Sequence, residues 1–451
     1  MNFEGTEILS LAAEMAQRAK PHEQIDVMIS HSTSTSVKAF RSEVESFTSA
    51  ESFAFGIRVI ADHRQGFASA GTLERAALLE TLEEARDNRK FGEQDEFLGL
   101  AEPDGIEAVR IDHWNPSILD IDSEQKIAIA LDLERRTVES DPRITGVRTA
   151  GWSDHAGEVA YATSTGVLLH ERGTSCSVGV QALSAEDGET QTGAAGDAAR
   201  SLAALDIDRV IREASDRATR MLGATQPKSA RLPIVLEPRL ALTLIGILSG
   251  MIDGEAVNKG RSPFGDRLNE PIASPLLTCV DDPTDLRSIA ASSFDGEGLA
   301  CRRNLLIESG HLRTFLQNSY TARRAGSRST GSAVRGARSL PGVSAQVLVI
   351  EPGQTPAAEL LKGMGNALFV NSLTGLHSGV NPVSGDFSVG ADGILIRDGV
   401  LAEPVRELTL ASTVQRLLLD IIAVGDDQEW TSSGDAGCTL VIGDVSLSGS
   451  D

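Results

Sequence analysis

Apolar residues recur at helical spacing in some stretches of the chain and alternate with polar residues in others. Ile8, Leu11 and Met15, for example, fall on one side of a helix. This spacing predicts helices over residues 6–19, 73–90, 123–139, 207–222, 238–251 and 408–424. Alternating or short apolar runs predict strands over residues 25–30, 36–40, 53–60, 67–70, 147–152, 159–163 and 166–183 in the first half, and over 232–236, 305–307, 311–316, 347–350, 394–397, 400–405 and 439–447 in the second.

Turn-forming residues separate these segments. Asp398-Gly399, between two apolar runs, is the strongest hairpin signal in the chain, and Glu308-Ser309-Gly310 marks a second hairpin. Ser123 is a suitable N-cap for the helix that follows it, and Gly425 is well placed to end the helix over 408–424. The polar residues 187–199, rich in Gly and Ala, are expected to form a mobile loop.

Successive hairpins with few helices favour antiparallel sheets over a parallel, doubly wound sheet. A chain of 451 residues exceeds the size of one comfortable core, so we expect two domains and an α+β fold. The first is an N-terminal α/β domain over residues 1–225, with a mixed or antiparallel sheet plus helices. The second, over 226–451, is a β-rich antiparallel domain with a few helices.

Acidic residues outnumber basic ones, and the net charge is −23. A protein that binds duplex nucleic acid needs a basic face to neutralise phosphates, so nucleic acid is not an expected partner. No apolar run reaches the roughly 18 residues that a membrane-spanning helix needs, so no membrane contact is expected. The first residues, Met1-Asn2-Phe3-Glu4-Gly5, lack a basic-then-apolar signal, which predicts a cytoplasmic protein.

One segment departs from this acidity. Residues 309–350 contain no Asp or Glu but include several arginines, among them Arg323 and Arg324. Arginine binds carboxylates well, so the segment could hold an acidic group of a partner or of a peptide terminus. The alternative is a solvated loop that satisfies the protein's own acidic surface.

Several motifs in the second half are similar to those of one known family. They are Phe294-Asp295-Gly296-Glu297-Gly298, Leu305-Leu306-Ile307-Glu308-Ser309-Gly310-His311-Leu312, Tyr320-Thr321-Ala322-Arg323-Arg324-Ala325-Gly326 and Ser384-Gly385-Asp386-Phe387-Ser388-Val389-Gly390. Together they resemble the C-terminal half of the TldD/PmbA (TldE) family. That family pairs a zinc peptidase subunit with a sister subunit that has lost the metal site. The resemblance therefore implies one of these two roles.

The resemblance also locates the positions that decide between the roles. The catalytic sister carries His-Glu-x-x-x-His, and a count without gaps places Ile245, Gly246 and Gly250 at the three motif positions. None of these residues is a metal ligand. The sister's third ligand is a cysteine, where this chain has residues 426–430 without one. We therefore expect no metal or cofactor on this chain and zinc on a partner subunit. A spatial cluster of scattered histidines stays open as an alternative metal site.

Two acidic motifs invite a functional interpretation. Asp295 and Glu297 could act as paired carboxylates, but the glycines beside them favour a tight structural turn. Asp386-Phe387-Ser388 is predicted to be a strand edge that a bound peptide could extend. His377 and Ser378 would line the same groove, with Arg323 and Arg324 as further candidates for contact with substrate or partner.

The preferred hypothesis is a metal-free, non-catalytic subunit of a TldD/TldE-type zinc metallopeptidase, in a heterodimer with a TldD-like catalytic subunit. The resemblance implies substrates with peptide or amide bonds, in unfolded or leader peptides or in small amide metabolites. One alternative is a homodimeric peptide-binding or scaffold protein without protease activity. Another is an independent hydrolase with an unrecognised site.

Overall fold

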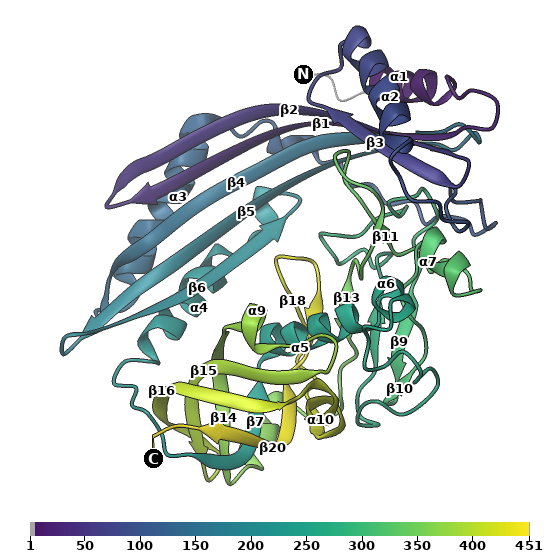
Figure 1. Ribbon diagram of the computed structural model, residues 1–451. Helices are drawn as coiled ribbons and strands as arrows, with labels where there is room; N and C mark the ends of the chain where they lie inside the picture. Colours follow the sequence, from purple (N-terminus) through teal and green to yellow (C-terminus); the bar gives the residue numbers. More distant parts are fainter. Residues whose placement is uncertain (1–4, 451) are drawn as a thin grey trace.

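The computed structural model describes residues 5–450. Residues 1–4, on which the prediction of no targeting signal partly rests, lie outside them. The N-terminal half is built on one six-stranded antiparallel sheet in the order β3-β2-β1-β4-β5-β6. Its strands are β1 (Gln24–Phe40), β2 (Glu43–Ala61), β3 (Arg64–Ala70), β4 (Ile144–Thr163), β5 (Leu168–Glu186) and β6 (Glu189–Ala199). Figure 1 shows this sheet curving over the C-terminal half.

The two faces of the sheet have different neighbours. In β1, Val27 and Ile29 point to the face that the helices cover, where they join a buried apolar cluster. Because strand side chains alternate, Asp26 and Met28 point the other way. Met28 packs with Ala337 of the C-terminal half. The concave face of the sheet is therefore the one that looks toward the C-terminal domain.

Four helices cover the outer face of the sheet in two groups. They are α1 (Thr6–Ala16), α2 (Arg75–Arg89), α3 (Ser123–Glu139) and α4 (Ile207–Thr219), with short 3₁₀ turns at Pro116–Ile118 and Leu202–Ala204. The first two pack over one end of the sheet and the last two over the other. The predicted N-cap of α3 was wrong by one residue: Asp122, not Ser123, caps the helix in a reciprocal pair with Gln125.

The expected mobile loop over residues 187–199 was also wrong. These residues form β6, which pairs with β5 along its whole length. Gly193 explains the composition, because a Cβ there would lie 2.3 Å from the carbonyl oxygen of Ala214 in α4. Small residues let the helix approach the strand closely, so the sequence lacks the apolar alternation of a typical strand.

The C-terminal half contains a small barrel. Strands β16, β15, β14, β7 and β20 pair in that order, and β16 also pairs with β20, which closes the sheet. The bounds are β7 (Ala230–Leu236), β14 (Asn366–Thr374), β15 (Asp386–Arg397), β16 (Val400–Thr413) and β20 (Leu440–Ser448), with β17 (Ile421–Val424) added to β20. Helix α5 (Pro238–Met251) contributes Leu244, Ile245 and Leu248 to the core that fills the barrel.

A second six-stranded sheet lies beside the barrel, in the order β10-β9-β8-β13-β19-β18. Its strands are β8 (Cys279–Asp281), β9 (Asn304–Glu308), β10 (His311–Leu312), β13 (Leu348–Ile350), β18 (Glu429–Trp430) and β19 (Ala436–Gly437). The remaining elements are α6 (Gly254–Asn258), α7 (Ser319–Arg324), β11 (Ala333–Val334), β12 (Gly342–Val343), α8 (Ala357–Lys362), α9 (Leu376–Gly379) and α10 (Val414–Leu419). None of the helices in residues 5–450 is long and apolar enough to cross a membrane.

The predicted helix over 408–424 was wrong. Leu408 and Leu410 belong to β16, and only Val414–Leu419 is helical before the chain continues as β17. Ile422, expected on the apolar side of that helix, is 55% exposed. The apolar run over 408–424 fits the spacing of a helix, but its start also fits the two-residue spacing of a strand. Burial of that start inside the barrel favours the strand. Gly425 therefore follows a strand and does not end a helix.

The α+β fold is confirmed, and so is the Asp398-Gly399 hairpin between β15 and β16. Both turn residues have positive φ, 50° and 78°, as a two-residue hairpin of this kind requires. The C-terminal half is not purely antiparallel, because β14 pairs with β7, and β13 with β19, in parallel. The predicted boundary between residues 225 and 226 lies between the two units. The N-terminal sheet ends at Ala199, and the first strand of the barrel begins at Ala230.

A buried group of charges joins the two halves. Asp26 of β1 accepts a hydrogen bond of 2.8 Å from Nη1 of Arg335 in the C-terminal half, and another of 2.8 Å from Nε of Arg58 in β2. The side chains of Asp26 and Arg335 are fully buried. Burial opposes ionisation of Asp26, but the charges of Arg335 and Arg58 outweigh it and hold its pKa below the ordinary value. This triad fixes one end of the sheet to the C-terminal domain.

We expect Asp26→Ala to lower the free energy of unfolding by about 3–5 kcal/mol, because two buried guanidinium groups would lose their carboxylate. Denaturant unfolding followed by circular dichroism measures this. The matched control is Asp444→Ala, which removes an exposed partner of Arg231 and should cost less than about 1 kcal/mol. Equal losses in the two variants would contradict a structural role for the triad.

Candidate functional site: a hollow between the N-terminal sheet and the C-terminal domain

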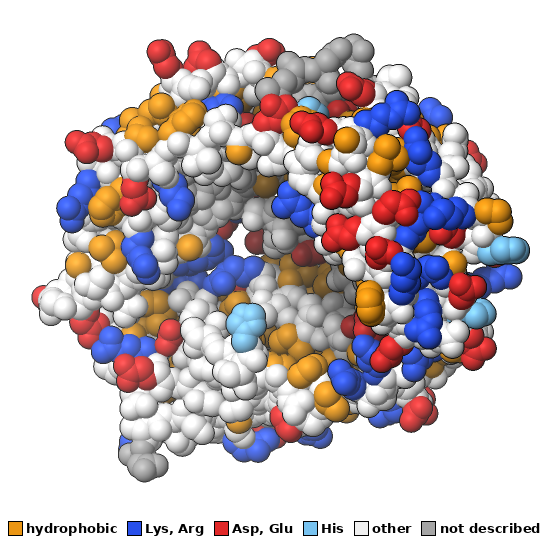
Figure 2. Space-filling model, turned by 45° about the horizontal axis from the view of Figure 1, so that its top comes forward, with side chains coloured by type: hydrophobic (Ala, Val, Ile, Leu, Met, Phe, Trp, Pro, Cys, Tyr) orange, Lys and Arg blue, Asp and Glu red, His pale blue; other side chains and the backbone are white. Residues whose placement is uncertain are grey.

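The molecule is hollowed between the concave face of the N-terminal sheet and the C-terminal domain (Figure 2). One hollow of about 720 Å³ is lined by the sheet and by Ile289 and Ser432 from the C-terminal half. A second, of about 680 Å³, continues along the sheet beneath the loop that contains Phe294. The two share Ser175 and Ile289 in their walls, so they form one continuous space.

Small side chains line the sheet side of this space. The hollows are lined on that side by Ser30, Ser32, Ser36, Ser153, Ser175, Ser177, Gly151, Gly157, Gly173, Gly179 and Gly196. Such a surface leaves room for another chain to approach the sheet closely. The signal was present in the alternation of serine through residues 30–36, but it predicts only a strand with a polar face. The sequence alone could not show that this face is enclosed.

Several titratable groups line the second hollow, among them His113, His155 and Glu171. Burial lowers the pKa of the half-buried His113 to about 4, and the Arg200 charge adds to this shift. Burial also lowers the pKa of His155. It raises the pKa of Glu171, against hydrogen bonds from Ser293. Both imidazoles are therefore neutral near pH 7.

Helix α5 carries the positions matched to the zinc motif. Figure 1 shows α5 on the side of the C-terminal domain that faces the sheet. Gly246 and Gly250 lie on its open face, where an added Cβ would meet no atom within 4 Å. Ile245 is fully buried in the barrel core instead. An imidazole at position 245 would have to replace core packing, and the other two positions have no side chain.

The region matched to the sister's cysteine ligand is also occupied by other contacts. Asp427 accepts hydrogen bonds from the backbone N–H and the hydroxyl of Thr439, at 3.0 and 2.6 Å. Cys438 is buried, and burial raises its pKa to about 12. Within residues 5–450 no group of three His, Cys, Asp or Glu side chains is placed to hold a metal ion. The residues present do not fit a zinc site of the His-Glu-x-x-x-His kind.

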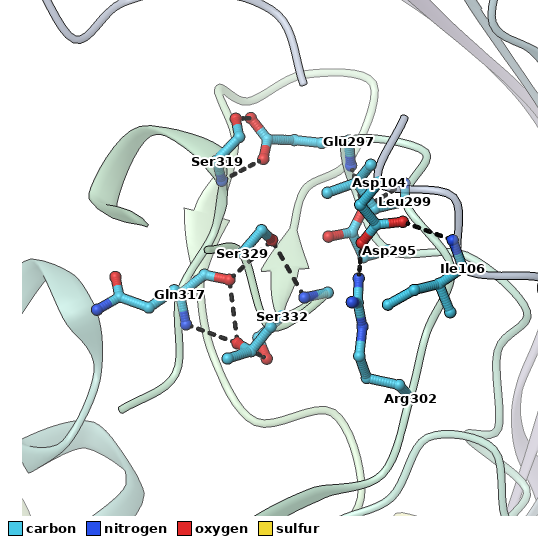
Figure 3. Close-up of polar contacts among 12 residues, drawn as sticks. Asp104, Ile106, Asp295, Glu297, Leu299, Arg302, Gln317, Ser319, Ser329 and Ser332 are labelled. Atoms are coloured by element: carbon cyan, nitrogen blue, oxygen red, sulfur yellow. Dashed lines mark hydrogen bonds and ion pairs between the residues drawn. The ribbon is translucent and has the colours of Figure 1, made fainter. Parts of the chain in front are cut away.

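The acidic motif at 295–298 is a structural turn (Figure 3). Asp295 accepts hydrogen bonds from the backbone N–H groups of Glu297, Leu299 and Ala333, at 2.9, 3.0 and 3.2 Å. Glu297 accepts from the backbone N–H and the hydroxyl of Ser319, at 2.8 and 2.7 Å. Both carboxylates are thus turned inward, toward groups of the same domain.

The same turn contacts the N-terminal sheet. Gly298 has a φ of +79°, and a Cβ there would lie 2.9 Å from the ring of Tyr161 in β4. Arg302, close by, forms an ion pair of 2.6 Å with Asp104 from the connection between α2 and α3. The motif that the sequence singled out therefore lies at the joint between the two halves, and the structural interpretation accounts for its glycines.

The residues predicted to form a groove are only partly brought together. Asp386–Ser388 is not a free edge, which corrects the prediction: β15 pairs with β16 on one side, and Phe387 bridges to Val380 on the other. Phe387 is 5% exposed and belongs to the barrel core. Asp386 and Ser388 are exposed, as are His377 and Ser378 on α9, which packs against β15. A groove role for these four side chains stays a prediction.

The two arginines lie apart from that group, on α7. Arg323 donates to the backbone carbonyl oxygens of Phe97, Gly99 and Leu100, at 2.7, 2.9 and 3.3 Å. It holds the chain's own connecting segment, and burial lowers its pKa. Arg324 is exposed and contacts the Tyr320 hydroxyl. Of the two, only Arg324 has a guanidinium group that is open to a partner's carboxylate.

One spatial cluster of histidines does exist, on the helix-covered face of the sheet. His31 contacts Glu158 through Nδ1 at 3.2 Å and Glu51 through Nε2 at 2.8 Å. His170 contacts the other oxygen of Glu158 at 3.0 Å. Glu158 bridges the two imidazoles, and His31 and Glu158 are also among the residues that line the second hollow. The sequence could not show it, because the members come from four strands.

Comparison with known proteins places these features in one class. The described domains match, in order, PmbA/TldA metallopeptidase domain 1 over residues 25–89, the central domain over 116–222 and the C-terminal domain over 229–449. The metalloprotease PmbA of Escherichia coli O157:H7 is 28% identical over 440 residues, which cover 96% of this chain and 94% of that protein. A PmbA homologue of Haemophilus influenzae is 28% identical over 443 residues, with the same coverage.

Solved structures share the fold. The crystal structure of TldE from Thermococcus kodakarensis matches with a TM-score of 0.88 over 98% of this chain and 99% of that one, at 21% identity. The three domain matches together span most of the sequence. The chain belongs to the PmbA/TldD metallopeptidase family. The family models divide the N-terminal half into two parts that contribute to one continuous sheet.

We expect Gly246→Ala and Gly250→Ala each to raise the free energy of unfolding by about 0.5–1 kcal/mol. Alanine is the better helix former, and both sites have room for a Cβ. Thermal and denaturant unfolding measure the effect. The control is Gly298→Ala, where positive φ and the Tyr161 ring predict a loss. Destabilisation by either alanine would show that close packing requires the two glycines, and would contradict their position on an open face of α5.

Burial raises the pKa of Asp295 to about 7, the Glu297 charge adds to this, and three backbone N–H groups oppose it. Because the folded pKa exceeds the unfolded one, the contribution of Asp295 to stability is complete below about pH 4. It is lost as the pH rises through 7. The stability difference between wild type and Asp295→Asn should therefore shrink by up to a few kcal/mol over that range. Parallel curves in denaturant unfolding at several pH values would contradict this.

Proposed function

We propose that this chain is the metal-free, non-catalytic subunit of a two-subunit zinc metallopeptidase of the TldD/TldE type. The observation that carries the proposal is the set of residues that helix α5 has at the matched positions. At the positions matched to His-Glu-x-x-x-His it presents two glycines to open space and keeps Ile245 in the core. A wall of this kind can enclose a substrate but supplies neither imidazole nor carboxylate to a metal.

The hollow supports a role in holding an extended chain. Serine and glycine line its sheet side, so a polypeptide backbone can approach without steric conflict. Substrates of this kind are peptide or amide compounds, such as unfolded or leader peptides or small amide metabolites. Hydrolysis would take place at zinc held by a TldD-like partner, in the cytoplasm. This chain would contribute one wall and an interface.

Two alternatives make different predictions. A homodimeric binding or scaffold protein would hold peptide without any partner and without turnover. An independent hydrolase would cleave alone, and His155 and Glu171 in the second hollow would be its candidate groups. The proposed subunit does neither by itself.

Reconstitution with a sister subunit that carries His-Glu-x-x-x-His tests the proposal. We expect no peptidase activity from this chain alone, little from the sister alone and full activity from an equimolar mixture. Replacing Glu of the sister's motif by Gln should abolish turnover while size-exclusion chromatography still shows the complex. Full activity of the sister alone, or robust cleavage by this chain in excess chelator, would contradict the proposal.

A further inference from the structure

Strand β2 is much longer than the strand on its outer side. β3 pairs with β2 only across residues 55–61. Residues 43–54 pair with β1 on one side, and in the part of the chain that the structure describes no strand lies on the other. At about 3.4 Å per residue, this free edge is roughly 40 Å long.

The same stretch is exposed on both faces as well as along its edge. All ten residues from Glu43 to Ser52 are exposed. They include two apolar side chains, Val44 and Phe47, which are 39% and 41% exposed. Because of a bulge at Glu45, both lie on the same face, opposite Ala39 and Val37 of β1. Long edges with unpaired N–H and C=O groups and exposed apolar residues are usually covered by another element.

The charges of this edge indicate what covers it. Glu51 shares the face of Val44 and Phe47, Glu43 lies on the other face opposite Phe40, and Glu45 is the unpaired residue of the bulge. Glu51 contacts His31, whereas Glu43 and Glu45 form no ion pair with the described residues. The edge thus carries three carboxylates, on both faces and at the bulge, beside two exposed apolar side chains, and a complementary strand carries basic residues near the carboxylates.

A second copy of this chain brings like charges together in several of its possible pairing registers. Two copies related by a twofold axis pair in antiparallel fashion, with each residue opposite its mirror position about the centre. A centre at residue 45 places Glu45 opposite itself, one at 47 places Glu43 opposite Glu51, and one at 48 places Glu45 opposite Glu51. Like charges directly opposite each other destabilise such pairs. The net charge of −23 on each copy adds to the repulsion.

We propose that residues 43–54 are the strand-pairing surface through which this chain binds its catalytic sister subunit. The partner strand carries Lys or Arg opposite Glu43 and Glu45, and an apolar contact for Phe47. The inference rests on the proposed function and deepens it. Ser46 and Thr48 point to the concave face, opposite Lys38 and Ser36 of β1, so an added strand continues that face and extends the hollow toward the sister.

Two pairs of matched variants test the surface. Val44→Asp and Phe47→Asp alter the edge, and Val400→Asp and Phe91→Asp make the same changes at exposed residues elsewhere. The probe is the sister subunit with His-Glu-x-x-x-His, titrated by calorimetry. We expect each edge variant to weaken binding at least about tenfold and each control to stay within about twofold. Glu43→Lys/Glu45→Lys should weaken binding as much, through repulsion by the partner's basic residues.

Hydrogen exchange gives a direct readout of strand pairing. Backbone amides of residues 43–54 should exchange fast in the free chain and more slowly in the complex, because pairing gives outward N–H groups an acceptor. Circular dichroism and thermal unfolding confirm that each variant folds.

The possible results separate this inference from the proposed function. Unchanged affinity in the edge variants, with unchanged exchange at 43–54 in an active complex, would overturn the interface and leave the proposed function standing. Absence of any complex with the wild-type chain would overturn both. A wild-type homodimer that Phe47→Asp dissociates would assign the edge to a second copy and overturn the choice of partner.

Discussion

The structure depends on a buried ion triad that joins its two halves. Asp26, Arg58 and Arg335 lie where the N-terminal sheet meets the C-terminal domain, and none of them is exposed to more than a trace of solvent. Buried charges are costly unless fully paired, so the triad tolerates little change in the angle between the halves. It acts together with the close contact between Gly298 and Tyr161. The sheet is thereby held above the barrel and not collapsed onto it.

The hollow follows from this constraint. With one end of the sheet fixed, its concave face stays apart from the C-terminal domain, and small side chains line the sheet side of the space between them. In a peptidase such a space would contain metal ligands. Here the motif positions on α5 are glycines or core residues. The chain keeps the architecture of the family, and none of the three matched positions carries a metal ligand, which is the observation on which the proposed partner rests.

Local patterns in the sequence predicted local structure well. Helix α5 and the Asp398-Gly399 hairpin follow from apolar spacing and turn residues alone, because neighbours in the chain decide them. The prediction was wrong where tertiary contacts decided. β6 has a composition set by close packing under α4, and the start of the 408–424 run is a strand because it closes a barrel.

The site was harder to predict than the fold. The absence of the zinc motif could be judged from Ile245, Gly246 and Gly250, but only the structure shows that two of them face open space. Asp26 and Arg335 are 309 residues apart, so nothing local links them. Arg323 was a reasonable candidate for binding a carboxylate, yet its guanidinium group holds backbone carbonyls of its own chain. The edge at Asp386 was misjudged because its neighbours come from distant parts of the sequence.

Metal content, measured by native mass spectrometry on the untagged chain, its sister and the reconstituted pair, tests the central claim most directly. The account predicts no bound zinc on this chain and about one zinc ion per pair, which stays with the sister when the subunits are separated. About one tightly held zinc ion on the isolated chain, removed only by chelator, would contradict it.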